Sequence, residues 1–301
     1  MRQTENPDKS FRVGYVAIVG KPNVGKSTLM NSLLHQRLAI VSPKPQTTRH
    51  RILGILNGEH HQVIFLDTPG LMHPKYLLQE AMVKTARRTM KEADLILMMV
   101  EVPSLDPDDE KVIQTLGDFN VPKFLIINKV DIVSKNHILP LIDHFRTTEL
   151  FQEVIPISAL KADGLDLLLS LILKSLPKGE PFYPSDTVSD EPERFFASEI
   201  IREQIYLQYG EEIPYSTTIQ VQEFQEKTGR KDFIRAVIIV ERDSQKGIII
   251  GKGGQALKRV GKSAREGIEH FTGRPVFLEL EVRVKKKWRK NASLIKRLGY
   301  R

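Results

Sequence analysis

One loop, from Gly20 to Ser27, limits what this chain can fold into more than any other segment. It has the sequence GKPNVGKS and stands between the apolar run VGYVAIVG and the helix-like stretch GKSTLMNSLLHQ. Its glycines allow backbone N–H groups to turn inward around phosphate oxygens, its last lysine can bridge two phosphates, and its serine can ligate magnesium. A helix that begins at such a loop adds a dipole that favours an anion. The segment therefore predicts a strand, a phosphate-binding loop and a helix in direct succession.

The same alternation of strand and helix continues through roughly the first 175 residues. Buried parallel strands appear as short, nearly continuous apolar runs, because helices cover both faces of their sheet. The run RILGILNG predicts an additional strand that forms a hairpin with HQVIFLD. Residues 1–180 are therefore predicted to form an α/β domain with a doubly wound, mostly parallel sheet. The core strands are assigned to VGYVAIVG, HQVIFLD, DLILMMVE, PKFLIINK and EVIPIS.

A second motif, DTPG, ends one of these apolar runs about forty residues after the phosphate loop. On its own, a D-x-x-G sequence is explained by a turn after a strand. At this distance from a phosphate loop it is typical of a nucleotide-dependent switch. Asp67 is predicted to hold Mg²⁺ through a water molecule, and the amide of Gly70 is predicted to sense the γ-phosphate.

A third motif, NKVD, predicts which base is bound. The carboxylate of Asp131 can accept two hydrogens, from N1 and the 2-amino group of guanine, whereas adenine offers neither. A site built on such a pair discriminates by about 10⁴-fold or more. Asn128 is predicted to support the loop and the base edge, and the stem of Lys129 to cover the base. The backbone amides of SAL, residues 158–160, are predicted to meet the guanine 6-oxo group. In this order the motifs predict a GTPase.

The polar, proline-containing segment SPKPQTTRHRI predicts a mobile switch between the first two motifs. Thr47 or Thr48 is expected to close on Mg²⁺ and the γ-phosphate, and its release after hydrolysis is the usual conformational signal. Spacing does not choose between the two, and we favour Thr48.

Leu71 occupies the position where Ras-like enzymes carry a water-orienting glutamine. We therefore expect slow hydrolysis without a partner. Asn23 either helps to bind a monovalent cation such as K⁺ or simply braces the loop.

The predicted site binds GTP or GDP with Mg²⁺. The predicted nucleotide contacts are Gly20, Lys21, Pro22, Asn23, Val24, Gly25, Lys26, Ser27, Thr28, Asp67, Thr68, Pro69, Gly70, Leu71, Asn128, Lys129, Asp131, Ser158, Ala159 and Leu160. The predicted catalytic residues are Lys26, Thr47, Thr48, Asp67 and Gly70, and the predicted Mg²⁺ ligands are Ser27, Thr48 and Asp67.

A break in the pattern follows the last helix-like stretch. The segment LPKGEPFYPSDTVSDEPE contains four prolines and several acidic residues, and it predicts a linker at residues 181–192. Beyond it, helix-like and strand-like runs follow the order αββααβ. We therefore expect a second, α+β domain over residues 193–301, which ends in a basic tail.

The positive charge of the chain is concentrated near its C-terminus. Residues 246–301 contain 16 Lys and Arg against four Asp and Glu, while the whole chain has a formal net charge of +8. Such a block predicts a polyanionic partner, either nucleic acid or an anionic membrane surface. A basic run with an aromatic residue, such as VKKKWRKNASLIKR, suits both. Trp288 either stacks on a base or anchors the tail to its domain.

The loop GKGG lies between two predicted helices of the second domain. A G-x-x-G loop in this context is typical of a KH domain, in which the loop clamps a single-stranded nucleic-acid backbone. The following helix carries an apolar stripe toward the sheet and basic residues beside the loop. The isoleucines before the loop are expected to line a groove for bases, with at least one in the core. The predicted RNA contacts are Ile248, Ile249, Ile250, Gly251, Lys252, Gly253, Gly254, Lys258, Arg259, Lys262, Lys285, Lys286 and Lys287.

From about Val13 to Tyr300 the chain resembles the Era family of bacterial GTPases. The resemblance rests on GKPNVGKSTLMN, SPKPQTTRHRI, FLDTPGL, NKVD, PISAL, IIIGKGGQALKRVGKSAR, GRPVFLEL and LGY. It implies a type II KH domain at the C-terminus and makes Leu71 an ordinary residue of the family. It also implies assembly of the small (30S) ribosomal subunit through binding near the 3′ end of its ribosomal RNA. Association with the inner face of the membrane is a further property of the family.

Composition favours a reducing, cytoplasmic location. The chain has no cysteine, its first residues lack an apolar signal core, and no apolar run is long enough to span a bilayer. We expect a monomer that also associates peripherally with the cytoplasmic face of the cell membrane. The alternative function is a membrane-surface signalling GTPase whose basic block binds anionic lipid. It is disfavoured by the lack of an amphipathic helix with a large apolar face. A non-hydrolysing GTP-binding module is opposed by the complete set of Mg²⁺ ligands.

Overall fold

The computed structural model describes residues 11–102 and 107–300, so the N-terminal residues that were searched for a signal core lie largely outside it. The described chain forms two units. One comprises the described residues up to Ala39, together with Thr48–His73 and Met82–Asp190. The other comprises Ile40–Thr47, Pro74–Ala81 and the described residues from Glu191 onward.

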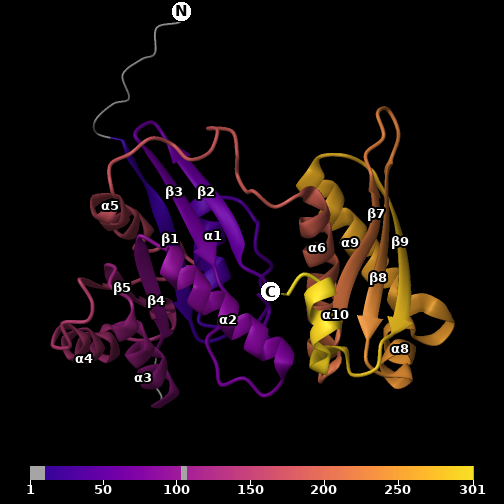
Figure 1. The fold of residues 1–301 in the computed structure, drawn as a ribbon, viewed down its shortest axis with the longest axis horizontal. Helices are drawn as coiled ribbons and strands as arrows, with labels where there is room; N and C mark the ends of the chain where they lie inside the picture. The colour runs from indigo at the N-terminus through magenta and orange to yellow at the C-terminus, as the bar shows by residue number, and fades with distance from the viewer. Residues whose placement is uncertain (1–10, 103–106, 301) are drawn as a thin grey trace, which may run out of the picture. The chain divides into compact units, whose positions relative to one another are not determined.

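The first unit is built on a six-stranded sheet in the order β2-β3-β1-β4-β5-β6 (Figure 1). Neighbouring strands are parallel except β2 and β3, which form the predicted antiparallel hairpin. The predicted α/β fold is therefore confirmed. The strands are β1 (Arg12–Gly20), β2 (Ile52–Gly58), β3 (His61–Asp67), β4 (Leu95–Glu101), β5 (Lys123–Asn128) and β6 (Glu153–Pro156).

Helices and short 3₁₀ turns connect these strands. The helices are α1 (Lys26–Leu34), α2 (Leu77–Glu92), α3 (Pro107–Gln114), α4 (Lys135–Arg146) and α5 (Leu165–Ser175). The 3₁₀ turns are η1 (Thr115–Asp118) and η2 (Val130–Ile132). Strands β1, β4 and β5 are almost wholly buried, as expected for central parallel strands covered on both faces. Their carboxyl ends meet at one edge of the sheet, where ligands bind in open α/β folds.

The segment that contains the predicted linker also packs along the edge of this sheet. The amide of Phe182 donates to Oε1 of the buried Gln62 at 2.7 Å, and the amide of Ile55 donates to the carbonyl of Val188 at 2.8 Å. Strand β2 is the edge strand, and an uncovered edge exposes unpaired N–H and C=O groups. The proline-rich segment supplies partners for this edge, so its composition marks a covering loop as well as a connection.

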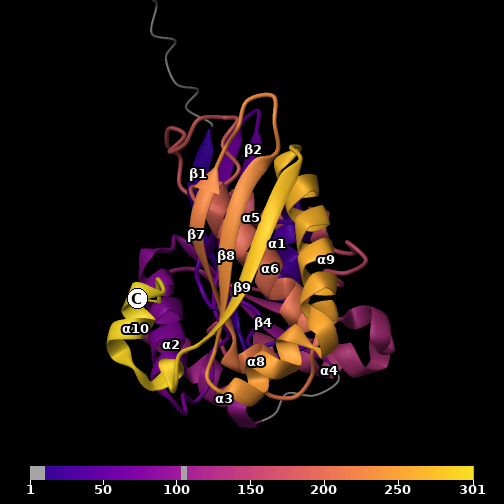
Figure 2. The same ribbon diagram turned by 90° about the vertical axis from the view of Figure 1, so that its right-hand side faces the viewer.

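The second unit contains a three-stranded sheet, β7-β8-β9, in which β7 and β8 are antiparallel and β8 and β9 are parallel (Figure 2). Helices α6 and α9 lie side by side against one face of this sheet. The elements are α6 (Glu193–Gln208), α7 (Ile213–Ser216), β7 (Thr218–Gln225), β8 (Asp232–Val240), α8 (Asp243–Ile250), η3 (Lys252–Gly254), α9 (Gln255–Thr272), β9 (Val276–Val284), η4 (Trp288–Lys290) and α10 (Ala292–Arg297).

The core of the second unit lies between α6, α9 and the sheet. Val260, Ala264 and Ile268 repeat at helical spacing along α9, and each is fully buried against β8 and β9. This is the stripe that the sequence predicts, although its outer members Leu257 and Phe271 are only partly buried. Among the described residues, no helix is both long and apolar enough to cross a membrane.

Candidate nucleotide site and nucleic-acid interface

The phosphate loop joins β1 to α1, and two of its glycines are required by the geometry. Gly20 and Gly25 have φ values of 145° and 102°, a region that side chains rarely adopt. A Cβ atom on Gly20 would lie 2.3 Å from the carbonyl oxygen of Met99, and one on Gly25 would lie 2.2 Å from Nδ2 of Asn128. The glycines thus allow the phosphate loop to pack against β4 and against Asn128 of the NKVD motif while it turns back on itself.

Lys26 brings a desolvated positive charge into this loop. Its side chain is buried, and Nζ donates to the carbonyls of Gly20 at 3.1 Å and Lys21 at 2.7 Å. Burial lowers the pKa of Lys26 to about 8, although the nearby Asp67 and Glu101 act in the opposite direction. Because the ammonium has lost most of its water, phosphate oxygens beside it would relieve an existing desolvation cost.

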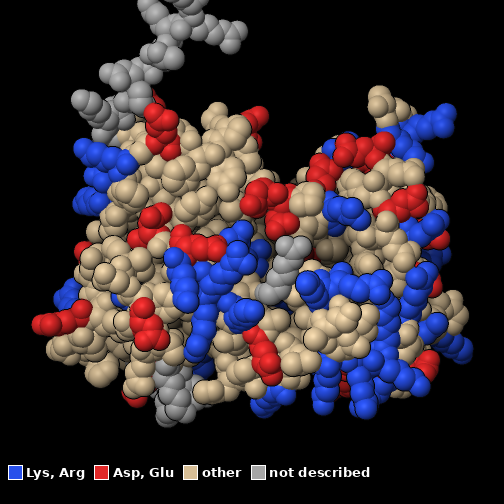
Figure 3. Space-filling model, viewed as in Figure 1, with Lys and Arg blue, Asp and Glu red and all other residues tan. Residues whose placement is uncertain are grey.

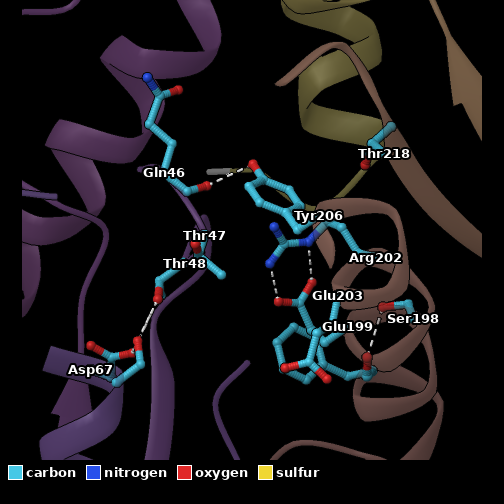
Figure 4. Close-up of polar contacts among 12 residues, drawn as sticks. Gln46, Thr47, Thr48, Asp67, Ser198, Glu199, Arg202, Glu203, Tyr206 and Thr218 are labelled. Carbon is cyan, nitrogen blue, oxygen red and sulfur yellow. Dashed lines mark hydrogen bonds and ion pairs between the residues drawn. The ribbon is translucent and has the colours of Figure 1, made fainter. Parts of the chain in front are cut away.

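Three hard oxygen donors meet beside the lysine. Ser27 Oγ donates to Asp67 Oδ2 at 2.6 Å and lies 2.8 Å from Thr48 Oγ1. Thr48 Oγ1 in turn lies 3.2 Å from the same carboxylate oxygen of Asp67 (Figure 4). Asp67 is fully buried, and its Oδ1 has no hydrogen-bond partner among the described residues. Burial raises the pKa of Asp67 to about 6, although Lys26 opposes the rise. A buried carboxylate oxygen without a partner, next to two hydroxyls, fits a magnesium ion.

The two adjacent threonines take different positions. Thr48 belongs to the first unit and joins Ser27 and Asp67, whereas Thr47 Oγ1 donates to the carbonyl of Lys44 at 2.7 Å in the second unit. The structure therefore places only one of the two candidate hydroxyls beside Ser27 and Asp67, the other predicted Mg²⁺ ligands. Sequence spacing could not separate them, because both are close enough along the chain.

The DTPG motif packs tightly against the phosphate loop. A Cβ atom on Gly70 would lie 2.6 Å from the backbone nitrogen of Pro22, so this position has no room for a side chain. The amide of Leu71 donates to the carbonyl of Gly20 at 2.9 Å. The Leu71 side chain is buried in the core of the first unit and does not point toward solvent. It therefore contributes packing here and has no means of orienting a water molecule.

The loop that carries the NKVD motif is held by Asn128. Its Nδ2 donates to the carbonyl of Val24 at 2.8 Å, and its Oδ1 accepts from the amide of Ala159 at 2.9 Å. One side chain thus ties the NKVD motif to both the phosphate loop and the SAL motif. The amide of Ser158 donates to the carbonyl of Asp163 at 3.1 Å, so two of the three SAL amides have partners within the protein in this structure. Leu160 has the one SAL amide without such a partner among the described residues, and the contact of SAL with the base stays a prediction.

Sequence inspection missed Glu101, which forms an ion pair with Lys129. Glu101 is the last residue of β4, and Lys129 directly follows β5, the parallel neighbour of β4. The position of Glu101 could have identified it, because a carboxylate at the carboxyl end of a buried parallel strand lies at the ligand-binding edge of its sheet.

In the second unit, a groove of about 840 Å³ runs along α9 beside the GKGG loop. Its apolar surface comes from Leu257, Leu278 and Leu280, and Gly261 leaves room between them. Its remaining lining includes the basic residues Lys258, Arg259, Lys262 and Arg265. An apolar floor with basic residues along it suits a strand whose bases pack inward and whose phosphates face the basic side chains.

Comparisons with known proteins cover both units. Residues 15–129 match the family described as 50S ribosome-binding GTPase, and residues 212–289 match the KH domain family. GTPase Era of Syntrophus aciditrophicus is 46% identical over 292 residues, which cover 96% of this chain and 95% of that protein. GTPase Era of Geobacter metallireducens is 45% identical, and the aligned residues cover 97% of this chain and 99% of that protein. This chain belongs to the Era family of GTPases.

Solved structures of Era share its fold. An alanine variant of Aquifex aeolicus Era bound to GDP and AlF₄⁻ has a TM-score of 0.93 and is 44% identical, with 96% of this chain and 99% of that chain covered. Era in complex with MgGDPNP and nucleotides 1506–1542 of 16S ribosomal RNA gives the same values. The sequence-based assignments of family, GTPase class, and G domain followed by a KH domain are therefore confirmed.

The structure places the three isoleucines before the GKGG loop of this Era-family chain outside the groove beside α9, and it places one of them in the core, as expected. Ile249 is fully buried in the core of the second unit, whereas Ile248 is half-exposed and Ile250 is partly buried. None of the three lines the groove beside α9; Leu278 and Leu280 of β9 do. An α8 of only eight residues must bury one isoleucine against the sheet to stay attached. The alternation in VFLEL could have identified the two leucines, because i and i+2 share one face of a strand.

The GKGG loop itself has the backbone that its glycines predict. Gly251, Gly253 and Gly254 all have positive φ values, between 59° and 77°. A Cβ atom on Gly251 would lie 2.6 Å from Cβ of Ala256, so this glycine permits a close approach of the loop to α9. Lys252 is exposed at the tip of the loop, where it is accessible to a ligand.

In the tail of this Era-family GTPase, Trp288 acts as an anchor. Its side chain is fully buried, Nε1 donates to the carbonyl of Ser216 at 2.8 Å, and its ring stacks on Tyr300 at 6.2 Å. It therefore presents no surface on which a base could stack. The anchor fixes the lysines on either side of it, since Lys285 also donates its amide to the carbonyl of Val240.

Proposed function

We propose that this Era-family GTPase uses a GTP-dependent switch in its first unit and binds the 3′ region of small-subunit ribosomal RNA through its second unit. The observation that carries the proposal is the groove beside the GKGG loop, with its apolar floor and basic lining. The related Era structure that contains nucleotides of 16S ribosomal RNA supports the choice of ligand. Assistance in assembling the 30S subunit follows as the function, exercised as a monomer in the cytoplasm.

In the first unit, we assign the roles from the geometry. Ser27 and Thr48 would hold Mg²⁺, with Asp67 beside them, and the ion would neutralise charge on the phosphates. Lys26 supplies a fixed positive charge, and the backbone amides of the phosphate loop bind oxygens around it. Asp131 would select guanine. Related Era structures that contain MgGDPNP and GDP with AlF₄⁻ support this arrangement.

In the second unit, the GKGG loop and Lys252 would clamp the RNA backbone. Bases would pack on Leu257, Leu278 and Leu280. The basic residues of α9 would neutralise the phosphates as the strand passes.

The first switch segment, Ile40–Thr47, would carry the nucleotide state to this unit. Within the second unit, Glu203 of α6 accepts a hydrogen bond from the amide of Val41, and the Tyr206 hydroxyl donates to the carbonyl of Gln46 at 2.9 Å (Figure 4). Lys44 donates to the carbonyls of Tyr206 and Tyr209 at the C-terminus of α6, where the helix dipole favours a cation. The next residue along the chain, Thr48, lies beside Ser27 and Asp67 and would ligate Mg²⁺. We propose that ordering of Thr48 by the nucleotide alters these contacts.

Two substitutions of Gly261 test the RNA groove. A Cβ atom there would lie 3.5 Å from Cδ1 of Leu280, an ordinary contact, so Gly261→Ala should retain RNA binding and raise the free energy of unfolding by about 1 kcal/mol. Gly261→Leu should fill the groove and lower the affinity for a 3′-terminal ribosomal RNA oligonucleotide by at least about tenfold. Fluorescence anisotropy measures the affinity, and GTP turnover without RNA serves as the folding control. Equal RNA affinity of the leucine variant and the wild type would refute the groove as the binding site.

Because Leu71 is buried, a monovalent cation held near Asn23 is proposed to support hydrolysis. Asn23 is exposed in the phosphate loop with a φ of 71°, so its side chain is available to a ligand. GTP turnover should be faster in potassium than in sodium buffer by about tenfold, an effect comparable to about 1.4 kcal/mol of transition-state stabilisation. Asn23→Ala should remove the difference. Equal wild-type rates in the two buffers would leave Asn23 with the bracing role alone.

The alternative ligand for the basic block is an anionic membrane surface, which would place the protein peripherally on the cytoplasmic face. A lipid surface needs exposed positive charge but no groove. The apolar floor beside α9 therefore favours RNA. If the basic block binds lipid instead, Gly261→Leu should leave binding to anionic vesicles unchanged. Both the wild type and the Gly261→Leu variant should then have negligible affinity for RNA.

A further inference from the structure

A second basic hollow lies in the second unit, away from the groove along α9. It has a volume of about 600 Å³, and five of its eight lining residues are basic: Arg242, Lys286, Lys287, Arg289 and Lys290. Figure 3 shows Lys and Arg side chains gathered over the part of this unit that contains α8 and the C-terminal segment (Figure 3). The other lining residues are Tyr76, Glu241 and Asp243.

Arg289 is held in one orientation inside this hollow. Its guanidinium donates to Glu241 Oε2 at 2.5 Å, and its Cζ lies 5.0 Å from the centre of the Tyr76 ring. Its Nε is buried and has no hydrogen-bond partner among the described residues. An arginine oriented by a carboxylate and an aromatic ring gives the hollow a fixed positive charge, which attracts phosphate.

The hollow keeps a net positive charge after its internal pairing. Glu241 is neutralised by Arg289, which leaves Asp243 as the one remaining acidic group in the lining. Within the described chain, the side chains of Lys286, Lys287 and Lys290 form no ion pair or hydrogen bond. Because Trp288 is anchored in the core, these lysines stand on a fixed loop and not on a free tail. Binding an anion would therefore cost little backbone entropy.

The hollow and the GKGG loop lie at opposite ends of α8. Arg242 and Asp243 stand at the start of this helix, and Gly251 directly follows its end. Eight helical residues span about 12 Å at 1.5 Å per residue. A strand clamped at the GKGG loop could therefore reach the hollow by following α8.

We propose that this hollow is a second phosphate-binding site for the same RNA strand that the GKGG loop clamps. Lys286, Lys287 and Lys290 would contact phosphodiester oxygens, and the oriented guanidinium of Arg289 would add a fixed positive charge beside them. This inference rests on the proposed RNA-binding function. It extends that function, because it assigns the lysines of the tail to a second binding site that is distinct from the groove along α9. An RNA longer than the four nucleotides that a KH clamp covers is needed to occupy both.

The test compares two RNAs and two variants that each remove three charges. One variant is Lys286→Gln with Lys287→Gln and Lys290→Gln. The control is Lys231→Gln with Lys296→Gln and Arg297→Gln, all exposed in the second unit and outside the hollow. Affinity is measured against salt concentration for a four-nucleotide RNA and a twelve-nucleotide RNA.

For the longer RNA, the hollow variant should bind at least tenfold more weakly. The slope of log K against log salt should fall by about 2, since each lost phosphate contact on a single strand contributes about 0.7. The short RNA should bind the wild type and both variants alike. An unchanged slope for the longer RNA, or equal effects of the two variants, would overturn the second site. Loss of binding to anionic vesicles alone would assign the hollow to lipid phosphate and overturn it too. Failure of the wild type to bind even the short RNA would instead reject the groove, and the second site with it.

Discussion

Replacing Asp131 by asparagine is expected to change the base preference from GTP to xanthosine triphosphate by about 10⁴-fold. In the proposed site, the Asp131 carboxylate would accept hydrogens from N1 and the 2-amino group of guanine. Xanthine has an oxygen in place of that amino group, and an asparagine amide can donate to it. The GTP complex of the variant would place two donors against each other. Each lost or mismatched hydrogen bond in a desolvated site costs several-fold to a thousandfold in affinity.

The structure indicates that this substitution leaves the fold intact. Asp131 lies in the short turn η2 and is exposed, whereas the loop is held by Asn128 through Val24 and Ala159. Competition binding with GTP, ATP and xanthosine triphosphate measures the preference. Asp166→Asn, which removes an exposed carboxylate from α5 of the same unit, is the matched control and should retain GTP selectivity. An Asp131→Asn protein that still prefers GTP would assign base recognition to another residue.

The central elements of the fold could be predicted because local pattern and tertiary environment agree. The strands of the first unit are short apolar runs, and each is buried in a parallel sheet that demands such runs. Gly20 and Gly25 were recognisable because the backbone they adopt is nearly closed to other residues. For the same reason the GKGG loop could be placed between two helices.

Contacts that depend on tertiary packing could not be predicted. Nothing in the composition of residues 40–47 indicates that they associate with α6. Apart from the Lys44 side chain, the contacts use backbone groups of the segment, namely the amide of Val41 and the carbonyl of Gln46. Backbone groups are the same in every sequence. Likewise, three consecutive isoleucines before the GKGG loop look alike, and only the orientation of α8 decides that Ile249 is the buried one.

The choice between Thr47 and Thr48 also depends on tertiary packing. It gives the second prediction with a large expected effect. Thr48→Ala should lower GTP turnover at saturating nucleotide by about 10²-fold, a typical loss when one group that stabilises developing charge is removed. Thr47→Ala should change turnover by less than about threefold. The reason is geometric, since Thr48 Oγ1 lies 2.8 Å from Ser27 Oγ while the Thr47 hydroxyl is used by the carbonyl of Lys44.

The adjacent threonines provide their own matched control, because each substitution removes the same atoms from neighbouring positions. Turnover is measured over a range of Mg²⁺ concentrations, and Thr48→Ala should also need more Mg²⁺ to reach its maximum rate.

If Thr48 links the nucleotide to the contacts of residues 40–47 with α6, the Thr48→Ala variant should bind RNA equally with GDP and with a non-hydrolysable GTP analogue. In the wild type the two affinities should differ. Thr47→Ala, which leaves the magnesium site intact, should preserve that difference. A large loss of turnover in Thr47→Ala with a mild effect of Thr48→Ala would reverse the assignment, and would require the switch segment to shift by one residue when nucleotide binds.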